Sequence, residues 1–188
     1  MSLPTEDNHQ ERQPATITEI VGDLRRSLSD DSPGFAQFSC ADEEGFQAIC
    51  RELGDTWYHR DSDSRGVTTI EERSNRTGSG NHGFSTDSLQ WHTDSAGHRS
   101  PPRTTLLWCA ENDAQGGDSL VAAASAVDSH LHHEHPTLRE SLYSCNAATF
   151  YSGDDRYVGP ILTRNEGTIC VRLRLDDLGT CHTRLPGT

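Results

Sequence analysis

The sequence contains no lysine, so arginine supplies all 16 basic residues, against 29 acidic ones. The formal net charge is therefore −13. Nucleic-acid binding needs a basic surface that neutralises phosphates, and anionic membranes also attract basic segments. The charge balance thus argues against both partners. The missing lysine itself we attribute to coding bias rather than to function.

Long apolar runs, CxxC pairs and a signal sequence are also missing. No stretch approaches the roughly 18 apolar residues of a membrane-spanning helix, and the beginning, "MSLPTEDNHQERQ", is polar and acidic. The six cysteines form no CxxC pair, which argues against a structural zinc site. These features predict a cytoplasmic protein whose thiols are reduced and mostly buried. The motifs of phosphate loops, serine hydrolases and dinucleotide-binding domains are absent too.

The length of 188 residues suits one domain of ordinary size. A hydrophobic fraction of only 32% indicates that much of the chain is loop or disordered terminus. We therefore predict a disordered leader over 1–14 and a single domain over 15–188.

Apolar periodicity predicts helices over 15–29 and around Phe46, Ile49 and Leu53, the second ending at Gly54. Residues 124–143 read as two further helices, with Pro136 beginning the second. Alternating or β-rich segments predict short strands at 35–39, 66–73, 88–94, 104–110, 118–123, 146–151 and 168–175. This order indicates an α+β fold built on an antiparallel sandwich or jelly roll.

The stretch "LQWHTD" places His92 and Asp94 two residues apart. On a strand, side chains at this spacing point to the same face. An imidazole and a carboxylate side by side supply two of the three ligands of the triad that holds ferrous iron in oxygenases. The same triplet also occurs by chance on solvated strands, so it does not identify a metal site alone.

A longer ordered pattern follows: "WHTDSAGHRSPPRTTLLWCAENDAQGGDSLVAA". It contains the His-x-Asp motif, a loop with Pro101 and Pro102, an apolar segment, and the turn 116–119 of sequence GGDS. This pattern resembles the iron- and 2-oxoglutarate-dependent oxygenases of the taurine dioxygenase and clavaminate synthase group. The resemblance extends over roughly residues 30–178.

The resemblance implies a double-stranded β-helix (jelly roll) with flanking N-terminal helices. It makes His92 and Asp94 ligands of Fe(II), and it places Ser119 where a hydroxyl bonds a carboxylate of the cosubstrate 2-oxoglutarate. Ser119 could instead be an ordinary turn residue. The implied activity is hydroxylation of a small molecule by O2, coupled to conversion of 2-oxoglutarate into succinate and carbon dioxide. The substrate expected from the family is an amino acid or an intermediate of specialised metabolism.

In the family, a second histidine ligand and an arginine that binds 2-oxoglutarate normally lie far beyond the His-x-Asp motif. The number of residues that follow His92 in this sequence is smaller than that separation. We therefore expect a fold that is incomplete at its C-terminus, with reduced or absent turnover. In "CHTRLPGT", His182 and Arg184 are late candidates, but a frayed polar tail is the better interpretation. Two alternatives stay open: a non-catalytic relic or binding subunit, and a cupin-like metal-binding protein.

The run "HLHHEH" holds a group of four histidines at 130, 132, 133 and 135. Its spacing is not HExxH, the pattern of a catalytic zinc helix. We therefore interpret it as a solvated helix end.

Overall fold

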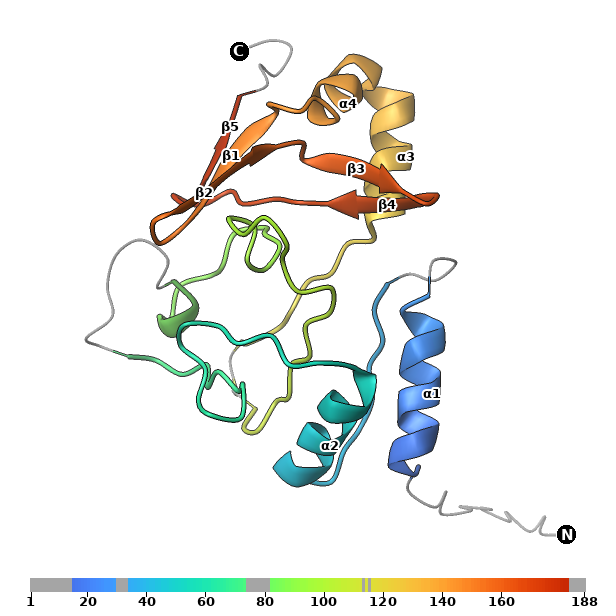
Figure 1. The fold of residues 1–188 in the computed structure, drawn as a ribbon, viewed down its shortest axis with the longest axis vertical. Coiled ribbons are helices and arrows are strands. Elements are labelled where there is room, and N and C mark those ends of the chain that lie inside the picture. The colour runs from blue at the N-terminus through green and yellow to red at the C-terminus, as the bar shows by residue number, and fades with distance from the viewer. Residues whose placement is uncertain (1–14, 30–33, 74–81, 113, 115, 183–188) are drawn as a thin grey trace, which may run out of the picture. The chain divides into compact units, whose positions relative to one another are not determined.

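A computed structural model describes residues 15–29, 34–73, 82–112, 114 and 116–182 (Figure 1). The chain divides into two compact units, Met1–Gly54 and Asp55–Thr188. The predicted leader over 1–14 lies outside the described residues, and the single domain over 15–188 stays a prediction.

The first unit contains two helices, α1 (Ile17–Ser27) and α2 (Glu43–Leu53). Thr16 caps α1 and Asp42 caps α2, because each side chain accepts a hydrogen bond from a backbone N–H of the first turn. Each helix buries apolar side chains spaced three residues apart: Val21, Leu24, Phe46 and Ile49. Both predicted helices are confirmed, and the second ends at Gly54 as expected.

In the second unit, α3 (Ala124–Glu134) and α4 (Pro136–Leu142) follow one another directly. Proline occupies the first turn of α4, where its missing N–H costs no hydrogen bond, so the predicted helical pair is confirmed. Asp128 of α3 is buried, and its carboxylate accepts two hydrogen bonds from Arg139 at 2.7 and 2.9 Å and one from the Tyr143 hydroxyl at 2.9 Å. This ion pair ties the two helices together.

Five strands in the described part of the second unit form two antiparallel sheets. The three-stranded sheet has the order β2-β1-β5, and β3 pairs with β4. The strands are β1 (Ala148–Ser152), β2 (Asp155–Gly159), β3 (Leu162–Asn165), β4 (Thr168–Val171) and β5 (Gly179–Cys181). Both hairpin turns contain a glycine with positive φ, Gly153 and Gly167, as tight turns require.

The core of this unit forms where β1 meets the segment that follows His92 and Asp94. Its buried residues are Ala96, Ala147, Ala148, Phe150 and Ile161, with Leu142, Tyr157 and Leu173 packed around them. Ala96 lies only two residues after Asp94. The candidate ligands are therefore anchored to the core through their own chain.

Several strand predictions are wrong. The segments 35–39, 66–73, 104–110 and 118–123 have no strand in the structure, and 88–94 contributes only an isolated bridge between His92 and Arg174. A strand requires a pairing partner, which alternation in the sequence does not supply. Leu107 and Leu120 are accordingly 73% and 79% exposed.

Predicted strands 146–151 and 168–175 are confirmed in part as β1 and β4. The others, β2, β3 and β5, were not predicted. Helices with small antiparallel sheets make the fold α+β, whereas the complete jelly roll stays a prediction.

All six cysteines are free thiols. The prediction that they are mostly buried is wrong: four are exposed and two are partly exposed. Cys170 on β4 and Cys181 on β5 are among the exposed thiols. Among the described residues, no helix is long and apolar enough to cross a membrane.

We predict that Asp128→Asn lowers the free energy of unfolding by about 2 kcal/mol at pH 7, because it removes charged hydrogen bonds from a buried site. The hydrogen bonds from Arg139 lower the pKa of Asp128. Its contribution is therefore present above the ordinary aspartate pKa and is lost as pH falls through the lowered value. Urea unfolding at pH 7 and pH 3 measures both effects. Asp154→Asn, in the exposed β1–β2 turn, is the control. It should change neither the free energy of unfolding at pH 7 nor its decrease at pH 3.

Candidate metal centre

His92 and Asp94 point their side chains toward one another from an extended segment. The distance between His92 Nε2 and Asp94 Oδ1 is 3.6 Å. Each side chain has a further partner on its other side: His92 Nδ1 lies 2.7 Å from the Gln90 carbonyl oxygen, and the Thr105 hydroxyl donates to Asp94 Oδ2 at 2.8 Å. The predicted juxtaposition of the two residues is therefore observed, even though their segment is not a strand.

These outer partners determine which atoms can bind a cation. A carbonyl oxygen only accepts hydrogen bonds, so His92 Nδ1 carries the proton and the lone pair of the neutral ring lies on Nε2. Thr105 occupies one carboxylate oxygen and leaves Oδ1 toward the histidine. Metal-binding histidines and carboxylates are typically oriented by such outer hydrogen bonds. The donor set of Nε2 and Oδ1 therefore fits a divalent metal ion.

The pKa shifts of His92 and Asp94 also fit a bound cation. The neighbouring Asp94 carboxylate raises the pKa of His92, with a smaller contribution from the Gln90 carbonyl, against opposing effects of burial and Arg174. His92 in turn lowers the pKa of Asp94, assisted by the hydrogen bond from Thr105. In the absence of metal, the pair thus favours a positive charge between its two side chains. A metal ion supplies such a charge.

The segment after β4 holds this motif in place from the opposite side. Thr93 N–H donates to the Leu173 carbonyl at 2.7 Å, and Leu173 N–H donates to the Thr93 hydroxyl at 3.1 Å. These bonds fix the residue between the two candidate ligands. Side chains alternate along an extended chain, so fixing Thr93 on one face directs His92 and Asp94 to the other.

A third ligand does not join the pair within the described residues. There, no three histidine, cysteine or acidic side chains come close enough to hold a metal ion. The late candidate His182 extends β5: its Nε2 lies 2.8 Å from the Thr149 hydroxyl and its N–H donates to the Ala147 carbonyl at 2.7 Å. Its partner candidate Arg184 lies outside the described residues.

Ser119 lies in the exposed segment that leads into α3. No hydrogen bond among the described residues links it to His92 or Asp94, and its role toward 2-oxoglutarate stays a prediction. The turn before it is as expected, because Gly116 and Gly117 both have positive φ, at 149° and 79°.

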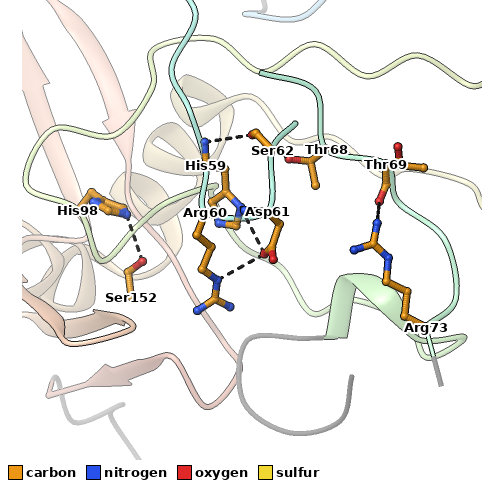
Figure 2. A network of polar contacts seen from close by, with 9 residues as sticks. All are labelled: His59, Arg60, Asp61, Ser62, Thr68, Thr69, Arg73, His98 and Ser152. Atoms are coloured by element: carbon orange, nitrogen blue, oxygen red, sulfur yellow. Dashed lines mark hydrogen bonds and ion pairs between the residues drawn. The ribbon is translucent and has the colours of Figure 1, made fainter. Parts of the chain in front are cut away.

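A histidine not identified from the sequence lies close to the pair. His59 interacts electrostatically with Asp94, and burial lowers its pKa. Its Nδ1 lies 3.3 Å from the backbone nitrogen of Asp61 and 3.5 Å from the Asp61 carboxylate. Figure 2 shows His59 and Arg60 directed at the Asp61 carboxylate. His59 follows no motif spacing relative to His92, so sequence patterns gave no signal for it.

His59 borders a cavity of about 220 Å³ whose wall includes Ser95, the residue after Asp94, but neither His92 nor Asp94. Arg60, Ser152 and Arg174 are also part of its wall. Adjoining it, His98 Nε2 lies 3.1 Å from the Ser152 hydroxyl, as Figure 2 shows. The cavity is lined by cationic and hydroxyl groups, which suits a small polar molecule.

The four histidines of α3 and its C-terminal end are exposed, as predicted for a solvated helix end.

Arg73 donates to the Thr69 carbonyl at 2.9 Å and lies over the Phe84 ring.

A family model described as "Taurine catabolism dioxygenase TauD, TfdA family" matches residues 11–184. No curated protein and no solved structure matches the chain.

We predict that Asp94→Asn lowers the pKa of His92 toward its ordinary value in the metal-free protein, because it removes the largest cause of the raised value. With the raised pKa, the pair stabilises the fold below the ordinary histidine pKa, and this contribution is lost as pH rises through the folded-state value. Histidine NMR titration measures the shift. The control is Asp155→Asn, because the Asp155 carboxylate lies 3.7 Å from a different histidine, His98. This substitution should leave the pKa of His92 unchanged.

Proposed function

The chain belongs to the taurine catabolism dioxygenase (TauD/TfdA) family, and from this premise we propose that it is an Fe(II)- and 2-oxoglutarate-dependent oxygenase that hydroxylates a small molecule. When bound, iron and 2-oxoglutarate supply oxidative decarboxylation with O2, coupled to hydroxylation of a C–H bond. The protein supplies the ligands, the substrate cavity and the orientation of both.

The 3.6 Å separation of His92 Nε2 and Asp94 Oδ1 is the observation that supports this proposal. Neutral imidazole suits the borderline character of ferrous iron, and the carboxylate offsets its charge. The Gln90 carbonyl and the Thr105 hydroxyl hold the two groups in the orientation that metal binding requires.

The cavity of about 220 Å³ supports a small-molecule substrate. Arg60 and Arg174 lie on its wall, each paired with an aspartate, Asp61 or Asp176, and a guanidinium has several donors, so that a ligand carboxylate can also be bound. The His59 imidazole adds a further polar group on the same wall. This lining is consistent with the amino-acid substrate expected from the family. The cytoplasmic location stays a prediction.

Two alternatives lead to different results. A non-catalytic binding subunit of the same fold predicts a folded protein that produces no succinate from 2-oxoglutarate. A cupin-like protein predicts metal binding through His92 and Asp94 without any effect of 2-oxoglutarate on the metal.

We predict that His92→Ala and Asp94→Ala each weaken binding of Fe(II) or Co(II) by at least about a hundredfold, because each removes a direct ligand whereas the loss of outer partners already costs tenfold or more. Anaerobic titration calorimetry measures the affinity. With Fe(II) and 2-oxoglutarate together, the wild-type protein should also show a weak visible charge-transfer band.

The exposed histidines of α3 could collect metal by themselves, so the matched control replaces His130, His132 and His133 by alanine. This variant should keep the affinity of the His92–Asp94 site. Loss of binding in the control, with wild-type binding in His92→Ala and Asp94→Ala, would contradict the proposed site.

We predict that Ser119→Val weakens 2-oxoglutarate binding about tenfold, which is the value of one hydrogen bond to a charged group, while metal affinity stays unchanged. Ser119→Thr keeps the hydroxyl and should bind 2-oxoglutarate like the wild type. Equal 2-oxoglutarate affinity in the valine and threonine variants would show that Ser119 is only a turn residue.

A further inference from the structure

Arg172 is the first residue after β4, and its side chain reaches the turn that follows Asp94. Its guanidinium donates to the carbonyl oxygens of Ala96 at 2.6 Å, His98 at 2.5 Å and Arg99 at 3.4 Å. Three carbonyls of one turn thus share a single cationic group as donor. Their own turn supplies only one backbone bond, from His98 N–H to the Ser95 carbonyl at 2.9 Å.

The turn is one that needs to be held. Ser95, directly after Asp94, has a φ of 53°, a left-handed conformation that is unfavourable for a residue with a side chain. Gly97 lies against the backbone of β1, and a Cβ there would lie 2.5 Å from the carbonyl carbon of Tyr151. The chain therefore leaves the candidate ligand Asp94 through a strained residue and reaches a tightly packed glycine two residues later.

Arg172 itself is firmly placed. Its N–H donates to the carbonyl of the buried Ile161 at 2.8 Å, and its guanidinium carbon lies 3.9 Å from the centre of the Tyr157 ring. The backbone bond joins it to the core, and the ring contact is a cation–π interaction that orients the planar group. Arg172 is thus also held by groups outside the turn that it contacts.

We propose that Arg172 is a positioning residue that holds the turn 95–99 and thereby keeps Asp94 directed at His92. The inference rests on the proposed function, since the group it orients is the proposed carboxylate ligand. The task requires arginine: a guanidinium presents several donors in one plane, whereas a lysine ammonium is a point charge that does not match three carbonyls and a ring face.

The first test uses the metal-free protein and hydrogen–deuterium exchange. Arg172→Lys and Arg172→Gln should both accelerate exchange of the amides in 95–99, while the amides of β1 and β2 exchange as in the wild type. Arg156→Gln on β2 is the matched control, because Arg156 is next to Tyr157 in sequence but exposed. It should leave amide exchange in 95–99 unchanged. Unchanged exchange in 95–99 for both Arg172 variants would overturn the proposal.

The second test measures Co(II) affinity by calorimetry together with the Co(II) absorption spectrum. Loss of an outer partner of a ligand weakens metal binding by about tenfold or more, and Arg172→Lys should show this loss with an altered spectrum. Tyr157→Leu removes the ring that orients the guanidinium and should give a smaller loss. If Arg172→Gln does not fold, these two variants still provide the test.

The outcomes separate the inference from the function on which it rests. If wild-type protein binds no metal through His92 and Asp94, the proposed function fails, while the exchange experiment still tests whether Arg172 holds the turn. If wild-type protein binds metal and Arg172→Lys binds it with equal affinity and an identical spectrum, the positioning role fails and the proposed function stands.

Discussion

The orientation of His92 and Asp94 depends on hydrogen bonds made by the backbone and by neighbouring hydroxyls, not on a regular sheet. Thr93 is fixed to Leu173, and the two residues beside it are directed to the opposite face. Each functional group then has one outer partner, Gln90 or Thr105. An isolated bridge has few hydrogen bonds. Each of these bonds therefore contributes more to the orientation of the two side chains than one bond would within a broad sheet.

The composition and these contacts are related. With no lysine in the chain, every cation of the fold except histidine is a guanidinium. Arg139 pairs bidentately with Asp128, Arg174 pairs with Asp176, and Arg172 joins three carbonyls. A planar group with several donors can connect segments that are distant in sequence, which suits a unit with short strands and long irregular connections. The use of arginine at these positions therefore contributes directly to the fold, whatever the reason for the absence of lysine.

The sequence predicted those features that depend on neighbouring residues. The Gly54 end of α2, the Pro136 start of α4 and the Gly116–Gly117 turn are local, and the structure contains them. The spacing of His92 and Asp94 is local too, and the two meet. Strand pairing depends on partners elsewhere, so alternation over 104–110 and 118–123 predicted strands that do not form. His59 approaches Asp94 from more than 30 residues away without a motif, and only folding reveals it.

The exposed leucines at 107 and 120 have a consequence for the behaviour of the protein in solution. Apolar side chains on open, unpaired segments attract one another between molecules, whereas a net charge of −13 keeps the molecules apart. This repulsion acts over about 10 Å at 0.1 M salt and over much less at 1 M. The colloidal stability of the protein is therefore electrostatic in origin, and concentrated salt or a pH near its isoelectric point of about 5.0 favours self-association.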